Sequence, residues 1–260
     1  LYRNGHIRRE FSGLIPRPKA GAPLPRPLSL ENAERLILQP DISTFIGLRD
    51  AAILSVLIGC GLRVSGVVAL NQEDLNWVDY EGQEWLVIRV REKGKKERLV
   101  PAPHDTRLLT RAYLGHEELQ EIDRTLPSGD RVLFVSTRAA IPRHEYHGER
   151  RRLSRGAILR MIDRHGERAG IPQSERHPHA ARHLYGTELA EAGADILQIQ
   201  ALMGHADPKS SSIYTRLAMR KLTERVARST PMARMRTPVS DLVKAIDRAS
   251  PGRRGRLQSS

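Results

Sequence analysis

The chain has 260 residues, 39% of them hydrophobic, which is enough for one substantial domain with a buried core. Its 43 lysines and arginines against 30 acidic residues leave a formal charge of +13. That charge indicates a polyanionic partner, because each cation that neutralises a phosphate releases a condensed counterion. A single cysteine, Cys60, excludes a disulfide within these residues and a thiolate metal cluster. With neither a signal-peptide pattern nor a run of about 18 apolar residues, the sequence predicts a soluble intracellular protein.

The N-terminal part of the chain is a linker followed by helices. Prolines recur between residues 13 and 27 and predict a semi-rigid basic linker, because proline fixes its own backbone and extends its predecessor. Ser29 is a typical N-cap for a helix that ends at about Leu38. Apolar residues predict a largely buried helix over 45–59 and a shorter helix over 64–70.

The middle of the chain predicts a β-hairpin. Residues 85–90 (WLVIRV) are rich in β-branched side chains and form the clearest strand, while residues 98–101 form its partner, with Gly94 in the bend. A helix is expected over 104–120, a further short strand over 132–135, and a mobile basic loop over 138–155. The predicted fold is therefore mainly helical with a small antiparallel sheet.

The C-terminal half is predicted to be almost entirely helical. The expected helices span residues 154–168, 179–192, 195–203, 210–216 and 217–228, with Asp195 as an N-cap. From residue 229 the chain becomes a basic tail with one further candidate helix near 239–249.

Three short motifs contain the residue types that chemistry on phosphates requires. GlyLeuArgValSer at 61–65 places Arg63 after a buried helix, where a buried guanidinium would need an anionic partner. In HisProHisAlaAlaArgHis at 177–183, a helix puts His179 and Arg182 on one face and so pairs a proton acceptor with a permanent cation. The spacing of His179 and His183 could also chelate zinc, but Ala180 stands where zinc hydrolases of this pattern have glutamate.

The third motif is LeuMetGlyHis at 202–205, followed nine residues later by Tyr214. Taken singly, each of these features is more often structural than catalytic. In this order and spacing, together with the lysine before Gly94, they resemble the catalytic domain of the tyrosine recombinases, or phage integrases. The resemblance covers roughly residues 28–228. It implies a mainly α (α+β) fold of the DNA breaking-rejoining type.

The resemblance also implies a set of catalytic roles. Arg63 and Arg182 clamp the non-bridging oxygens of one DNA phosphate, and His205 adds a hydrogen bond. Tyr214 attacks the phosphorus. Because a phenol has a pKa near 10, Tyr214 needs a base, and His179 is the candidate.

The hairpin supplies the remaining cations of the expected site. Lys93 matches the family's general acid, which protonates the departing 5′-oxygen. Lys95, Lys96 and Arg98 are expected to contact DNA. Arginines stabilise the charge and the phosphotyrosine bond conserves the energy of the phosphodiester, so the reaction is expected to need no metal, no ATP and no cofactor.

The expected organisation follows the same resemblance. Residues 1–27 are interpreted as the end of a missing N-terminal core-binding domain plus its linker, residues 28–228 as the catalytic domain, and residues 229–260 as a basic tail. The expected partner is double-stranded DNA, bound by a homo-tetramer. A cytoplasmic, nucleoid-associated location without membrane contact is expected.

Two departures from the family pattern keep alternatives open. One is the missing N-terminal domain, and the other follows Arg63. The family usually has an acidic residue three positions after the first arginine, and here that residue is Gly66. The leading hypothesis is a site-specific recombinase of a mobile element or phage. A DNA-binding relative that has lost catalysis and a type IB topoisomerase are the alternatives, although the spacing from LeuMetGlyHis to Tyr214 favours a recombinase.

Overall fold

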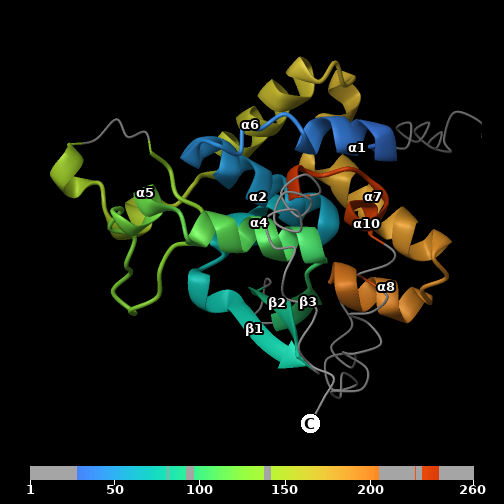
Figure 1. Ribbon diagram of the computed structural model, residues 1–260, viewed down its shortest axis with the longest axis horizontal. Helices are drawn as coiled ribbons and strands as arrows, with labels where there is room; N and C mark the ends of the chain where they lie inside the picture. Colours follow the sequence, from blue (N-terminus) through green and yellow to red (C-terminus); the bar gives the residue numbers. More distant parts are fainter. Residues whose placement is uncertain are drawn as a thin grey trace, which may run out of the picture.

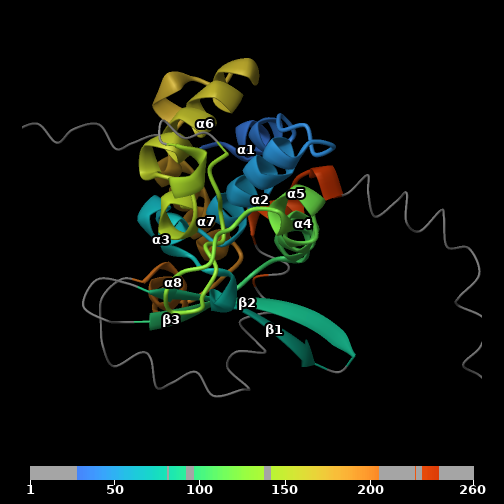
Figure 2. The same cartoon turned by 90° about the vertical axis from the view of Figure 1, so that its left-hand side faces the viewer.

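The fold is a group of helices around one central helix, with a small sheet at one end (Figures 1 and 2). The computed structural model describes residues 28–80, 82–91, 97–137, 142–204, 226 and 230–239. The central helix is α2 (Phe45–Gly59), in which all residues except Ile46 are buried. Helices α1, α4, α7 and α10 contact it from different sides. This arrangement confirms the predicted fold class.

The first three helices begin and end close to where the sequence predicts. Ser29 caps α1 (Leu30–Ile37) by accepting a hydrogen bond from the Asn32 amide, and Thr44 caps α2 in the same way through Gly47. Helix α3 (Val64–Ala69) follows after a short buried loop that contains Cys60. The ends of these helices could be predicted because N-caps and helix-ending glycines depend on only a few neighbouring residues.

The sheet has three antiparallel strands in the order β1-β2-β3, formed by β1 (Leu75–Tyr80), β2 (Gln83–Arg91) and β3 (Glu97–Pro101). The predicted hairpin of β2 and β3 is confirmed, although its bend at Gly94 lies outside the described residues. Strand β1 was not predicted. Residues 132–135 do not join this sheet, so that prediction is wrong: they make only isolated bridges, from Val132 to Asn71 and from Val135 to Arg152.

Two predictions in the middle of the chain need correction. The helix expected over 104–120 is two helices, α4 (His104–Leu114) and α5 (Glu117–Gln120), separated at Gly115. The described part of the expected mobile loop contains the short 3-10 helices η2 (Arg143–Glu145) and η3 (Gly148–Arg151). Arg152 then donates to the carbonyl oxygens of Val68 and Leu70, at 2.9 and 3.0 Å. These residues are therefore an anchored connection.

The C-terminal helices match their predicted ranges where the structure describes them. They are α6 (Arg155–Arg168), α7 (Pro178–Glu191) and α8 (Ile196–Met203), with the 3-10 helix η4 (Gln173–Glu175) before α7. The helices predicted over 210–216, 217–228 and 239–249 lie almost wholly outside the described residues.

The short helix α10 (Pro231–Arg234) belongs to a stretch that the sequence placed in the basic tail. Instead, Met232, Met235 and Val239 join the main hydrophobic core. A second, smaller core cluster joins α7 and α8 through Tyr185, Leu189, Leu202 and Val226. No helix among the described residues is long and apolar enough to cross a membrane.

Candidate active site

The two arginines of the sequence motifs reach the site from different elements. Arg63 is the N-cap residue of α3 and follows the buried loop after α2. Arg182 lies in the middle of α7 and is only 6% exposed. A guanidinium buried to this degree needs hydrogen-bond acceptors around it, because an unpartnered charge in the interior is costly.

Those acceptors lie at the end of α8 and in the loop after α2. Arg182 donates to the carbonyl oxygen of Gly61 at 2.5 Å and to that of Met203. Arg63 donates from both terminal nitrogens to the carbonyl oxygen of Gly204, at 3.5 and 3.4 Å. The last carbonyls of a helix have no donors within the helix and carry its partial negative charge, so cations are favoured there. The structure therefore brings Arg63 and Arg182 together.

The loop that carries Arg63 is fixed by close packing on α7. Gly61 has a φ of +59°, and a Cβ atom at this position would lie 2.3 Å from Cδ1 of Tyr185. Only glycine satisfies both constraints. Burial raises the pKa of Tyr185 far above its usual value, so this phenol stays protonated and serves as core. Burial also raises the pKa of the neighbouring Cys60 to about 12.

His179 lies in the first turn of α7 and is exposed. Its pKa is lowered, first by partial burial and then by the positive charges of His177, His183, Arg182 and Arg155. A lowered pKa keeps the imidazole neutral near neutral pH, which is the form that can accept a proton. His179 lies one helical turn before Arg182, so the imidazole and the guanidinium stand on the same helix.

In the described part of the chain, no further side chains join His179 and His183 to form a metal site. Both histidines are exposed on α7. No group of three or more histidine, cysteine, aspartate or glutamate side chains that could hold a metal ion occurs among the described residues.

The remaining predicted catalytic residues, Lys93, His205 and Tyr214, lie outside the described residues, as do Lys95 and Lys96. The described chain reaches the residues next to two of these segments. Strands β2 and β3 end at Arg91 and begin at Glu97 on either side of the hairpin bend, and α8 ends at Gly204 in the left-handed conformation. The catalytic roles of these residues stay predictions.

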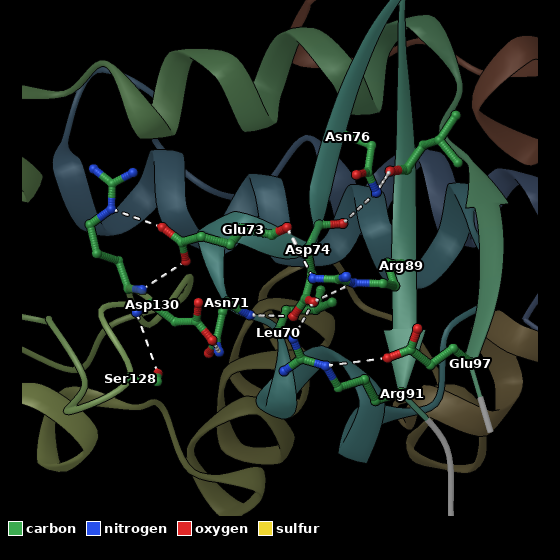
Figure 3. Close-up of polar contacts among 12 residues, drawn as sticks. Leu70, Asn71, Glu73, Asp74, Asn76, Arg89, Arg91, Glu97, Ser128 and Asp130 are labelled. Atoms are coloured by element: carbon green, nitrogen blue, oxygen red, sulfur yellow. Dashed lines mark hydrogen bonds and ion pairs between the residues drawn. The ribbon is translucent and has the colours of Figure 1, made fainter. Parts of the chain in front are cut away.

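Sequence reasoning missed the ion-pair network beside the bend of the hairpin (Figure 3). Asp74 is buried and accepts from Arg89 at 3.1 Å, while Arg91 pairs with it at 2.9 Å. Arg91 also approaches Glu97 of β3 at 3.8 Å. Asp74 directly precedes β1, the strand that was not predicted, so no local pattern indicated its role. The network links the residue before β1 to the ends of β2 and β3 that flank the bend.

Arg98, on β3, is only partly exposed and contacts α8. It donates to the carbonyl oxygen of Leu202 in the last turn of α8. Its expected contact with DNA stays a prediction.

Gly66 lies in α3, one turn after Arg63. A Cβ atom at this position would meet only Cγ1 of Val90, at 3.4 Å, and the backbone is not in the left-handed region. The backbone of α3 therefore has room for a side chain here, and the absence of the family's acid is not forced by packing.

Comparisons with known proteins agree with this fold. The model of the phage integrase family matches residues 27–221. Tyrosine recombinase XerC of Thermodesulfovibrio yellowstonii is 30% identical over 90% of this chain and 72% of that protein. Tyrosine recombinase XerD of Pseudomonas aeruginosa is 34% identical over 88% of this chain and 70% of that protein. The solved integrase from mycobacterium phage Brujita is 26% identical, with a TM-score of 0.57 over 94% of this chain and 70% of that chain.

Proposed function

Because the chain belongs to the phage integrase family, we propose that it cuts and rejoins DNA through a covalent bond between Tyr214 and a backbone phosphate. The class of enzyme is a site-specific DNA recombinase that breaks and rejoins strands. The observation that carries the proposed mechanism is the convergence of Arg63 and Arg182, from separate elements, on the end of α8. These two cations can act on one phosphate.

In the proposed step, the phenol oxygen of Tyr214 attacks phosphorus and the bond to the 5′-oxygen breaks. The phenol proton goes to His179, and Lys93 gives a proton to the departing 5′-oxygen. The product is a 3′-phosphotyrosine with a free 5′-hydroxyl. Rejoining is the same step in reverse with a 5′-hydroxyl as nucleophile, so the phosphate-ester energy is retained.

The arginines supply charge stabilisation to the proposed step. As phosphorus becomes pentavalent, negative charge grows on its non-bridging oxygens, and preorganised guanidinium groups bind this charge most strongly. Each guanidinium has five N–H donors in a planar fork. Arg63 and Arg182 can therefore keep their bonds to the backbone carbonyls and still present donors to a phosphate.

The partner of the proposed reaction is double-stranded DNA, consistent with the formal charge of +13. We further propose assembly of a homo-tetramer on DNA, and Lys95 and Lys96 as contacts to the DNA backbone. The proposed catalytic domain spans residues 28–228, with residues 230–239 packed into its core. A location at the nucleoid follows from the same proposal.

The test is capture of the covalent intermediate. A nicked suicide duplex, carrying a site selected from a random pool by repeated binding, is incubated with the protein and resolved under denaturing conditions. Wild type is expected to form an SDS-resistant adduct, and Tyr214→Phe to form none. Arg63→Ala and Arg182→Ala are each expected to slow adduct formation by about 10²–10³-fold, as for loss of one preorganised donor.

The matched control is Tyr185→Phe. It removes the hydroxyl of a buried tyrosine that has no hydrogen-bond partner among the described residues, so the adduct is expected to persist. An adduct that survives in Tyr214→Phe contradicts the nucleophile assignment, and no adduct from wild type on the selected site contradicts the proposed reaction.

A further inference from the structure

The end of α8 is held by a third arginine in addition to Arg63 and Arg182. The carbonyl oxygens of Leu202, Met203 and Gly204, consecutive in the chain, accept hydrogen bonds from Arg98, Arg182 and Arg63 respectively. We propose that Arg98 is a positioning residue: it fixes the last turn of α8, against which the two phosphate-binding arginines are set. This inference rests on the proposed function, in which those two arginines bind the phosphate.

The register of the sheet points Arg98 toward the protein interior. Arg98 pairs with Val90 of β2, which is buried, and so shares its face of the sheet. The next residue, Leu99, is on the opposite face and 47% exposed, while Val100 is buried again. Because side chains alternate along a strand, Arg98 faces the helices while Leu99 faces solvent. Strand β3 and α8 are in contact, and the two ribbon views agree on this (Figures 1 and 2).

The electrostatic surroundings place the Arg98 guanidinium beside the loop that carries Arg63. Against the larger effect of burial, the charge of Arg98 lowers the pKa of both Cys60 and Tyr185. Cys60 precedes Gly61 directly, and Tyr185 packs on Gly61. One cation thus connects β3, the end of α8 and the loop before α3.

The last turn of α8 needs a charged donor such as Arg98 because its carbonyls also hold Arg182 and Arg63. The final carbonyls of α8 carry the negative end of its dipole, and three cations share this charge. Without Arg98, the Leu202 carbonyl loses a charged donor and the last turn of α8 can fray. Met203 and Gly204 then no longer hold Arg182 and Arg63 in one geometry.

The experiment compares Arg98→Ala and Arg98→Lys with Arg91→Gln. Arg91 lies on β2 and pairs with Asp74 and with Glu97, so its substitution removes one cation of the same hairpin without removing a bond to α8. DNA affinity, its salt dependence and the cleavage rate at saturating suicide substrate are measured for each variant.

A positioning role predicts that Arg98→Ala slows cleavage at saturating DNA by roughly 10–100-fold, as small misplacements do. The dissociation constant should match that of Arg91→Gln, and Arg98→Lys, which keeps a charged donor, should recover part of the rate. If Arg98 instead grips phosphate, Arg98→Ala weakens binding, lowers the salt slope by about 1 and leaves cleavage at saturation unchanged. That result overturns the proposal.

Amide hydrogen exchange in the free protein separates this inference from the proposed function. Exchange in a peptide spanning residues 196–204 is expected to be faster in Arg98→Ala than in wild type and in Arg91→Gln. Unchanged exchange there overturns the role of Arg98. If wild type forms no covalent adduct, the proposed function fails, yet the exchange measurement still decides whether Arg98 fixes α8.

Discussion

In the proposed mechanism His179 accepts a proton, and neighbouring charges favour the neutral imidazole that this role needs. Its pKa is lowered by partial burial and by nearby cations, among them His183 one turn further along α7. A base works in its neutral form, so cleavage should fall as the pH drops through this lowered pKa. The acid limb of the pH–rate profile therefore reports on the surroundings of His179.

Replacing His183 tests this account. His183→Gln removes a neighbour that lowers the pKa of His179, so this pKa is expected to rise and the acid limb of cleavage to move to higher pH. NMR titration of the His179 ring measures the shift directly. His144→Gln, on an exposed histidine in η2, is the control and should leave the titration of His179 unchanged. An unchanged pKa in His183→Gln would show that this neighbour does not repel the charged ring.

Two glycines near Arg63 have opposite requirements. At Gly66, in the helical backbone of α3 with space for a Cβ atom, Gly66→Ala is expected to increase the free energy of unfolding by about 0.5–1 kcal/mol. At Gly61, with its φ of +59° and Tyr185 in contact, Gly61→Ala is expected to decrease it by more than that. Urea denaturation of the two variants measures both changes. Equal effects would contradict the backbone assignment.

At the scale of elements, a buried carboxylate joins α2 to α6. Asp50 is 1% exposed and is held by Arg49 at 2.7 Å, Arg164 at 3.0 Å and His165 at 3.1 Å. Burial alone would raise the pKa of Asp50, but the hydrogen bond from His165 and the charge of Arg49 outweigh it and lower the pKa. This carboxylate therefore stabilises the fold in its charged form.

The direction of that pKa shift gives a pH-dependent prediction. A lowered folded-state pKa contributes stability above the unfolded value of about 3.9, and this stability is lost as the pH falls through the folded pKa. Asp50→Asn leaves buried cations without their partner and should cost about 3–5 kcal/mol at pH 7, with a flatter loss of stability in acid. Asp163→Asn, in a surface pair with Arg176 at 3.5 Å, should cost under about 1 kcal/mol. Similar losses would contradict the role of Asp50.

The elements that could be predicted are those with local signals. Ser29, Ser154 and Asp195 accept hydrogen bonds from amides in the first turns of α1, α6 and α8, and each is a short polar residue of the kind favoured at N-caps. Strand β1 has no comparable signal, because it exists through pairing with β2. Residues 132–135 look like a strand since all four are apolar, but they are buried as an irregular segment with isolated bridges.

The site was predictable in its residue types but not in its contacts. The motifs indicated Arg63 and Arg182 as cations of one site. Their acceptors are backbone carbonyls of Gly61, Met203 and Gly204, and backbone atoms leave no trace in residue identity. Arg98 was expected to contact DNA, which stays a prediction. The face of the sheet on which its side chain lies depends on the register of β3 against β2 and has no local signal in the sequence.

At the scale of the whole molecule, residues 230–239 pack back against helices from earlier parts of the chain. Thr237 donates to Asp105 of α4 at 2.5 Å, and Arg234 pairs with Glu188 of α7 at 2.6 Å. Met232 is 3% exposed and lies against Gly59 at the end of α2. Residues 230–239 therefore act as a strap across α2, α4 and α7.

Shortening one side chain of this strap measures its contribution. Met232→Ala removes a buried side chain and is expected to decrease the free energy of unfolding by about 2–5 kcal/mol. Leu197→Ala, at an apolar residue that is 67% exposed on α8, should change it by no more than about 0.5 kcal/mol. If both variants unfold at the same urea concentration, the strap does not stabilise the domain.

Because Cys60 is buried, the rate at which its thiol is labelled reports how often the surrounding core unfolds. Cys60 is the only cysteine of the sequence, fully buried, and its raised pKa keeps the thiol protonated. A thiol-alkylating reagent can therefore label the chain only when the core beneath Gly61 and Arg63 opens. Labelling should be slow, should accelerate with urea as global unfolding does, and should be faster in Gly61→Ala. The labelling rate would therefore measure, without any substitution, how often the core beneath the proposed active site unfolds locally.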